Sequence, residues 1–331
     1  MATYILVDSM NLFFRAKHAV GGKDITMKTG MAMHTMFSSM RKAWNDFSGD
    51  HIVYCMEGRS WRKDFYPPYK QNRKVTAAKR TAREVEDDEI FLESYQDLCE
   101  FMIHQTNCTT LQCGLAEADD MIAAWIQAHP EDQHVIISTD SDFYQLLAPN
   151  VKQYNGVTQQ TITVEGIFDD KGKRVKDKKT GEPKVVPDPE WLLFEKCVRG
   201  DKSDNIFTAY PGARLKGTKN KVGIQEAFED RNTGGFNYNN FMLQRWVDHE
   251  EQEHRVRDDF DRNQILIDLT KQPEDVREAC FQAVQEAVDK PQIPQVGIRF
   301  MKFCTKWDLQ RLSQNPTEFG KILNSGIQDA S

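Results

Sequence analysis

The chain has 331 residues, of which 39% are hydrophobic and 28% are charged, and its formal net charge is −7 at pH 7. That length suits one large domain, or a core domain with a smaller appendage. No run of 18 apolar residues occurs, and the N-terminus lacks the features of a signal peptide, so we expect a cytoplasmic protein that does not enter a membrane. Seven cysteines without a C-x-x-C pair argue against a disulfide framework and against a zinc ribbon.

Positive charge is concentrated in three segments of this acidic chain. Residues 59–83 contain nine basic side chains and one acidic one, and residues 171–184 contain seven basic and two acidic ones. Residues 211–221 contain four bases and no acid. Such segments suit a polyanionic partner, although any one of them could equally be a solvated loop.

The first part of the chain, to about residue 165, alternates strand and helix signals, which indicates an α/β fold with a central, mostly parallel sheet. Apolar side chains from Met33 to Phe47 recur at helical spacing and predict a helix packed on the core. The predicted strands lie near residues 3–8, 51–56, 108–112, 134–139 and 150–154.

The rest of the chain is predicted in less detail. Residues 59–85 are basic and contain Pro67-Pro68, which excludes a continuous helix there. Further expected elements are a helix over about 86–105, a hairpin over 155–186, a helix from Asp188 to Gly200, and helices over 236–248, 273–289 and 306–324. No linker that would free a separate domain is visible.

Nine carboxylates occur in five short packets, three of which follow apolar strand-like runs. In an open parallel sheet the carboxyl ends of the strands share one crevice, so these acids are expected to meet there. Two charges about 4 Å apart repel by roughly 4 kcal/mol at an effective dielectric of about 20. Helix capping explains one acid per packet but not two or three. The acids therefore predict a site for Mg²⁺ or Mn²⁺, and they are Asp8, Glu57, Glu117, Asp119, Asp120, Asp140, Asp142, Asp201 and Asp204.

Other catalytic motifs are missing from the sequence. His249 and His254 are five residues apart instead of the four that a zinc-hydrolase helix requires, so the two rings would point to different faces. No Gly-x-Ser-x-Gly, Walker loop or dinucleotide fingerprint occurs, which leaves nucleotide hydrolysis with little support.

Taken in order, the segments VDSMN, YPPYKQNRK, AEADDMIA, STDSDFYQLL and RGDKSDNI resemble the flap endonuclease (5′ nuclease) family, in particular phage 5′-to-3′ exonucleases and the phage ribonuclease H that removes RNA primers. The resemblance covers about residues 3–230. It implies a PIN-like core that binds two Mg²⁺ ions, for which Mn²⁺ can substitute, together with a helical arch and a helix–three-turn–helix element. The nine acids would be the metal-site residues, with Asp119 and Asp140 essential to catalysis.

The resemblance also assigns roles to basic residues. Lys70 and Arg73, at the start of the arch, would act on the scissile phosphate, and residues 200–226 would grip the backbone of a duplex. Two positions depart from the family pattern: Glu57 replaces the usual Asp, and the segment PGARLKGTKNKVGIQ is longer than the family's hairpin, so we predict no potassium site there. The residues expected to bind nucleic acid are Arg59, Arg62, Lys63, Tyr69, Lys70, Arg73, Lys74, Lys79, Arg80, Lys202, Lys216, Lys219 and Lys221.

The resulting expectation is a metal-dependent, structure-selective 5′ nuclease. Its substrates would be DNA with 5′ flaps or nicks and RNA–DNA hybrids, and it would act as a monomer beside replication proteins such as a single-strand-binding protein. A PIN-like ribonuclease for single-stranded RNA and an inert DNA-binding scaffold are the alternatives. The expected organisation is a catalytic core over 1–186, with the arch at about 59–85, followed by a helical region over 187–331 that contains the DNA-binding element at about 187–228.

Overall fold

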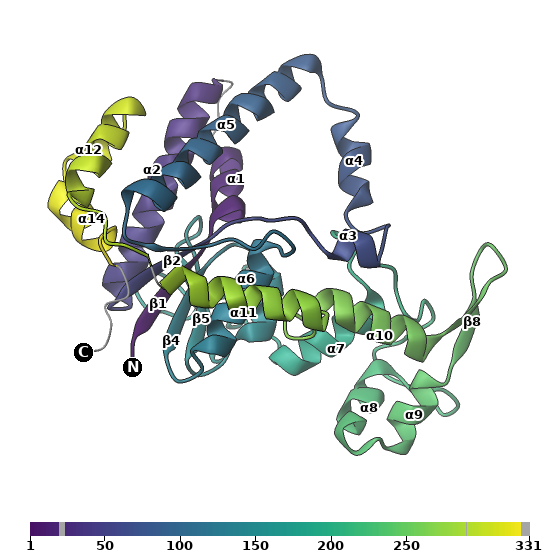
Figure 1. The fold of residues 1–331 in the computed structure, drawn as a ribbon. Coiled ribbons are helices and arrows are strands. Elements are labelled where there is room, and N and C mark those ends of the chain that lie inside the picture. The colour runs from purple at the N-terminus through teal and green to yellow at the C-terminus, as the bar shows by residue number, and fades with distance from the viewer. Residues whose placement is uncertain (20–23, 289, 326–331) are drawn as a thin grey trace. The chain divides into compact units, whose positions relative to one another are not determined.

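The computed structural model describes residues 1–19, 24–288 and 290–325, which form two compact units (Figure 1). The first unit consists of residues 1–59, 80–186 and 275–331, and the second consists of residues 60–79 and 187–274. The sequence suggested a boundary near residue 186, and the second unit does resume at residue 187. The C-terminal segment, however, packs with the N-terminal core, and residues 60–79 of the basic segment belong to the helical second unit.

A seven-stranded sheet forms the centre of the first unit, in the order β3-β2-β1-β4-β5-β6-β7. The first five strands are parallel and the last two are antiparallel additions, as the predicted hairpin after residue 155 requires. All five predicted strands are confirmed, and the fold is α/β. The strands are β1 (Thr3–Asp8), β2 (His51–Cys55), β3 (Thr109–Leu111), β4 (Gln133–Ile137), β5 (Val151–Asn155), β6 (Gln160–Thr163) and β7 (Gly166–Phe168).

Helices cover both faces of this sheet. Ile5 and Val7 of β1 belong to a large core with α2, α5, α12 and α14, which lie together in Figure 1. Tyr4, on the opposite face of β1, meets Trp125 of α6 edge-on, with ring centroids 5.1 Å apart. The helices of this unit are α1 (Ser9–Ala19), α2 (Ile25–Asp46), α5 (Ala82–Gln105), α6 (Ala118–Ala128), the 3₁₀ helix η1 (Ser141–Leu146), α11 (Glu274–Val288), α12 (Val296–Lys306), α13 (Gln310–Ser313) and α14 (Pro316–Ile322).

The second unit is mainly helical and has its own core, which includes Phe194, Val198, Ile224 and Phe241. Its helix α7 begins after the Asp188 cap and ends at Gly200, as predicted. The elements of this unit are α3 (Arg62–Phe65), α4 (Gln71–Ala77), α7 (Pro189–Arg199), α8 (Ile224–Glu229), the 3₁₀ helix η2 (Arg231–Thr233), α9 (Phe236–Met242), β8 (Arg245–Val247), β9 (Glu253–Arg255) and α10 (Val256–Ile267).

Three predicted helices differ from the structure. The helix expected over 236–248 stops at Met242, and the chain then forms the β8–β9 hairpin that contains His249 and His254. The helix expected over 306–324 is two short helices, because Asp308 has a positive φ of 50° and Pro316 begins a new helix. The helix expected from residue 86 begins at Ala82, since Thr81 and Glu84 form a capping box there.

None of the helices in the described part of the chain is both long enough and apolar enough to cross a membrane. All seven cysteines are free thiols, as their spacing predicted.

Candidate active site

The carboxyl ends of β1 and β4 carry the first pair of predicted site residues. Asp8 closes β1 and is 2% exposed, and its carboxylate accepts a hydrogen bond of 2.7 Å from Ser138 Oγ, just after β4. β1 and β4 are neighbours in the sheet, which explains why residues 130 positions apart in the chain meet there. Ser138 Oγ also accepts a hydrogen bond from the backbone N–H of Asp140, so one hydroxyl connects both acids.

Asp140 caps the 3₁₀ helix η1, and its carboxylate accepts the backbone N–H of Asp142 at 3.0 Å. Two polar side chains fix the loop that carries these acids. From β5, Gln153 Nε2 donates to the carbonyls of Ser138 and Asp140 at 2.9 and 2.8 Å. Asn11 Oδ1 accepts hydrogen bonds from the backbone and hydroxyl of Thr139.

Glu57 follows β2 at the same edge of the sheet. Its Oε2 accepts the backbone N–H of Ala118 at 3.3 Å, which ties it to the first turn of α6. The next residue must be glycine, because a Cβ on Gly58 would lie 1.9 Å from the carbonyl oxygen of Cys113. This close approach brings the loop after β2 against the loop that leads into α6.

Helix α6 contributes the acids of the AEADD packet. Glu117 is its N-cap, and Asp120 is fully buried and accepts the backbone N–H of Glu117 at 3.2 Å. The charge of Asp119 affects Cys55, the last residue of β2. Burial is the main cause that raises the pKa of the Cys55 thiol well above its usual range, and the charges of Asp8 and Asp119 add to it. Five acids from β1, β2 and α6 therefore belong to one edge of the first unit.

The acids of this edge repel one another, and the effect is visible at Asp8. Burial is the main cause that raises the pKa of Asp8 to about 7, and repulsion from Glu57 and Asp140 adds to it. The Ser138 hydrogen bond opposes the shift. Among the described residues, no group of three or more His, Cys, Asp or Glu side chains is arranged so that it could hold a metal ion. The donors are all carboxylates, which suits hard cations such as Mg²⁺. The assignment of individual ligands stays a prediction.

In the second unit, two predicted segments that lie about 130 residues apart form one polar assembly. The backbone N–H of Lys70 donates to the carbonyl of Asp204 at 2.8 Å, and Asn205 Nδ2 donates to the carbonyl of Pro68 at 2.7 Å. Asn72 Nδ2 donates to the carbonyls of Lys202 and Ser203. Lys70 adopts a left-handed conformation with φ of 54°, which is uncommon for a residue with a side chain and typical of functional loops.

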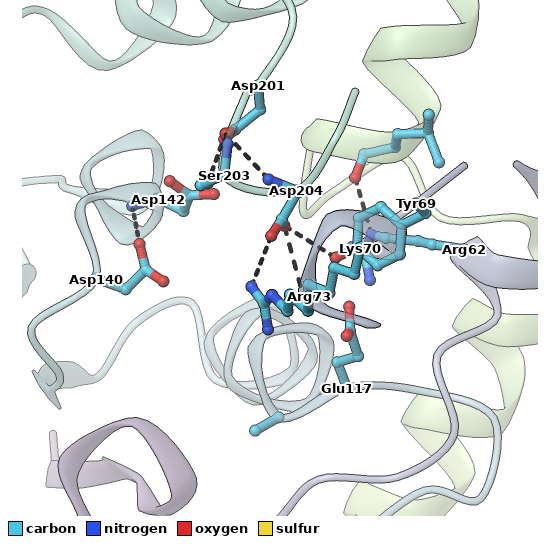
Figure 2. A network of polar contacts seen from close by, with 12 residues as sticks. Arg62, Tyr69, Lys70, Arg73, Glu117, Asp140, Asp142, Asp201, Ser203 and Asp204 are labelled. Atoms are coloured by element: carbon cyan, nitrogen blue, oxygen red, sulfur yellow. Dashed lines mark hydrogen bonds and ion pairs between the residues drawn. The ribbon is translucent and has the colours of Figure 1, made fainter. Parts of the chain in front are cut away.

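Figure 2 shows the Asp204 carboxylate at the centre of this assembly. Its Oδ1 accepts a hydrogen bond of 2.8 Å from Arg73 Nη2, and its Oδ2 accepts one of 3.1 Å from Tyr69 Oη. Lys70 Nζ lies 3.9 Å from the same Oδ2. Lys70 and Arg73, to which the family resemblance gives a role on the scissile phosphate, thus both contact one carboxylate in this structure.

Asp201 is held by a different cation. Lys196 Nζ donates to its Oδ2 at 2.8 Å, and Ser203 donates to its Oδ1 through both its backbone N–H and its hydroxyl. Burial alone would raise the pKa of Asp201, but the hydrogen bonds from Lys196 and Ser203 lower it to about 2. Asp201 therefore stays charged throughout the physiological pH range.

Two residues predicted to bind nucleic acid are instead part of the interior. Arg62 is 2% exposed, its Nε donates to the carbonyl of Leu266 at 2.8 Å, and its guanidinium lies over the ring of Trp61. The structure thus gives Arg62 a role in the packing of the second unit. Tyr69 is likewise buried, and only its hydroxyl reaches the Asp204 assembly.

The remaining predicted contacts lie at the surface. Arg80 is exposed but forms an ion pair of 2.5 Å with Asp88 of α5. The loop before α8 is closed by Glu226, whose carboxylate accepts the backbone N–H groups of Gly217 and Gly223. The exposed basic residues of the predicted set are Arg59, Lys63, Arg73, Lys74, Lys79, Arg80, Lys202, Lys216, Lys219 and Lys221.

Sequence reasoning missed the residues that position the acids. Ser138 and Gln153 are buried polar side chains within or just after strands, and Asn11 lies in the first turn of α1. Only Gln153 gave a signal in the sequence, because it stands inside the predicted strand near residues 150–154. A glutamine that is buried in a strand needs hydrogen-bond partners.

Comparisons with known proteins agree with this architecture. A family model described as the N-terminal resolvase-like domain of 5′-3′ exonuclease matches residues 3–174. The flap endonuclease of Escherichia phage T5 is 29% identical over 205 residues, which cover 61% of this chain and 63% of that protein. The flap endonuclease Xni of Shewanella halifaxensis is 30% identical over 232 residues, or 69% of this chain and 79% of that one.

Solved structures give the same picture for the fold. The structure of the phage T5 flap endonuclease in a pseudo-enzyme-product complex with DNA and metal ions has a TM-score of 0.58 and 22% identity, and the match covers 87% of this chain and all of that one. A zinc-bound structure of the T5 5′-exonuclease has a TM-score of 0.57 at 22% identity, and covers 86% of this chain and 99% of that one. At this identity the likeness concerns the fold. Because the family model spans more than half of the sequence, the chain belongs to the flap endonuclease and 5′-3′ exonuclease family.

Proposed function

We propose that the protein is a divalent-metal-dependent, structure-selective 5′ nuclease that hydrolyses phosphodiester bonds at 5′ flaps or from 5′ ends. The observation that carries the proposal is the buried Asp8, whose pKa is raised to about 7 by burial and by the neighbouring acids Glu57 and Asp140. The geometry points the same way, because Ser138 Oγ connects the carboxylate of Asp8 to the backbone of Asp140 at the ends of neighbouring strands. A buried acid with a strongly shifted pKa among other acids is a candidate functional site. The relatives are named flap endonucleases, and phosphodiester hydrolysis at a flap is therefore the reaction proposed for this chain.

The chemistry of the donor set supports two Mg²⁺ ions, with Mn²⁺ as a substitute. All the candidate ligands are carboxylates, and hard oxygen ligands favour these cations over zinc. When bound, the ions would activate water and stabilise the leaving oxygen of an in-line displacement. The acids from the ends of β1, β2 and β4 and from the start of α6 would hold them, with Ser138 and Gln153 keeping the β4 loop in place.

Lys70 and Arg73 are proposed to contact the scissile phosphate. In this structure both contact the Asp204 carboxylate, an anion that a phosphate would have to displace. Charge-assisted hydrogen bonds to an anion strengthen as negative charge develops on it, so these cations would favour the transition state. The exposed lysines of the loop before α8, Lys216, Lys219 and Lys221, would contact duplex phosphates and read structure instead of sequence.

The experiment is a cleavage assay with 5′-labelled substrates: a DNA flap, a nicked duplex, an RNA–DNA hybrid and single-stranded RNA, each with Mg²⁺ or EDTA. Mg²⁺-dependent cleavage of the flap, with single-stranded RNA left intact, supports the proposal. Cleavage of the hybrid would support the further proposal that the protein removes RNA primers during replication, the role that the family resemblance implies. Cleavage of single-stranded RNA alone would identify a PIN-like ribonuclease, and binding without cleavage would identify a scaffold.

A further inference from the structure

One aromatic side chain beside the Asp204 assembly is exposed, although most aromatic rings in the second unit are not. Phe207 follows directly on the loop that carries Asp201 and Asp204, and it is 56% exposed. An isolated exposed apolar residue is ordinary on a protein surface. Phe207 differs from that case because its backbone is held from several sides.

The carbonyl of Phe207 accepts two hydrogen bonds from α10. Asn263 Nδ2 donates at 2.8 Å and Arg262 Nη2 donates at 3.3 Å, and Asn263 is fully buried. The chain also passes so close to Gly200 that a Cβ there would lie 2.6 Å from the carbonyl carbon of Phe207. Buried polar contacts therefore fix the backbone position of a residue whose ring is exposed to solvent.

The surroundings of the ring are aromatic and cationic. Phe207 meets Tyr66 edge-on, with centroids 6.2 Å apart, and Arg262 lies over the ring of Tyr66 at 5.2 Å. The preceding loop carries the exposed Lys202 and is hydrogen-bonded to the segment that carries Lys70 and Arg73. A fixed aromatic face beside cations is the combination that binds a nucleobase together with its phosphate.

We propose that Phe207 stacks on the exposed face of a nucleobase at a flap junction, nick or duplex end. This inference rests on the proposed nuclease function and deepens it, because it assigns the recognition of an interrupted duplex to one residue. Phosphate contacts are the same on a continuous duplex, whereas an exposed base face exists only where stacking is interrupted. Phe207 would thus separate flap substrates from ordinary duplex, and it would act as a positioning residue and not in the chemical step.

The test compares binding to a flap substrate with binding to a continuous duplex whose two ends are closed by hairpin loops, in Ca²⁺ so that cleavage does not interfere. Phe207→Leu should weaken flap binding about five- to hundredfold and leave closed-duplex binding unchanged, since stacking on one base contributes about that factor. Phe207→Tyr should retain wild-type binding. The matched control is Phe236→Leu, which removes a ring that is 79% exposed on α9 in the same unit, and it should change neither affinity.

A second measurement needs no variant. Wild-type protein irradiated with a flap that carries 5-iodouracil at the junction should form a crosslink that maps to Phe207. Equal flap affinities for wild type and Phe207→Leu, an equal loss on both substrates, or a crosslink only elsewhere would overturn the inference. These outcomes are separate from the proposed function, which fails only if wild-type protein does not cut the flap in Mg²⁺.

Discussion

Arg73 donates a hydrogen bond of 2.8 Å to Asp204, a residue 131 positions further along the chain. The contact joins the two segments of the second unit to which the family resemblance gives roles in phosphate and metal binding. Tyr69 and Lys70 approach the same carboxylate, so the basic residues are already organised around an anion. A substrate phosphate would meet cations whose positions are set in advance.

The first prediction concerns Lys70. Replacing it with alanine should lower the single-turnover rate of flap cleavage about 10²- to 10³-fold and change affinity little, because its charge acts on the phosphate as the bond breaks. Rapid-quench kinetics with excess enzyme measure this step. The control is Lys178→Ala, which removes an exposed lysine of the first unit and should leave the chemical step unchanged. If Lys70→Ala affected only affinity, the residue would be a passive clamp.

The second prediction concerns the stability of the second unit. Arg62→Ala should lower the free energy of unfolding by about 1–3 kcal/mol, since it leaves the carbonyl of Leu266 without this donor and removes packing against Trp61. The neighbouring Lys63 is exposed, and Lys63→Ala should change stability by less than about 0.5 kcal/mol. Urea denaturation followed by fluorescence compares the two. Equal stability of both variants would show that Arg62 is not part of the packing.

The third prediction concerns pH in the absence of metal. The pKa of Asp8 rises from 3.8 to about 7 on folding, so the folded protein binds this proton more tightly than the unfolded chain does. Stability from Asp8 is therefore full below pH 4 and is lost as pH rises towards 7, by an amount on the order of 4 kcal/mol at most. Thermal denaturation in EDTA should show a lower melting temperature at pH 7.5 than at pH 5.5.

The Asp8→Asn variant isolates that effect, because asparagine carries no titrating proton and keeps an oxygen that can accept the Ser138 hydrogen bond. The variant should be more stable than wild type at pH 7.5 in EDTA. The difference should be smaller at pH 5.5 and should vanish only below about pH 4, where Asp8 is protonated in the unfolded chain as well. If the metal-free stability of wild type and of Asp8→Asn changed by the same amount between pH 5.5 and pH 7.5, the account of Asp8 would be wrong.

The fourth prediction is a steep salt dependence of DNA binding despite the net charge of −7. Each phosphate contact contributes about −0.9 to the slope of log affinity against log salt, so several contacts should give about −3 or steeper. Replacing both Lys219 and Lys221 with alanine should make the slope shallower by up to about 2. Fluorescence anisotropy over a salt series measures both slopes, and a flat wild-type response would rule out phosphate contacts as the main source of affinity.

The sheet and the acid-bearing loops were predictable because they depend on local pattern. Asp8, Glu57 and Asp140 each follow a short apolar run, and the rule that parallel strands share a carboxyl edge places them together. The caps of α7 were equally visible, with Asp188 before it and Gly200 after it.

The rest depends on contacts between distant residues. Nothing near Arg62 indicates that it is buried, because its partner carbonyl belongs to Leu266, 204 positions away. Helix α10 follows an acidic, polar stretch that resembles a loop, and it becomes a helix where Phe260 and Leu266 pack into the core of the second unit. The return of residues 275–331 to the first unit is also a matter of tertiary packing, through apolar residues such as Phe300 and Phe319.

The central claim is that the carboxylates at the edge of the first unit carry the chemistry through bound divalent ions, and Asp140→Asn tests it most directly. The amide keeps an oxygen that can accept the backbone N–H of Asp142, so the loop should hold its shape. We expect flap cleavage in Mg²⁺ to be abolished while flap affinity stays within about tenfold of wild type, a difference of roughly 1.4 kcal/mol. Substantial cleavage by this variant, or by wild-type protein in EDTA, would contradict the account.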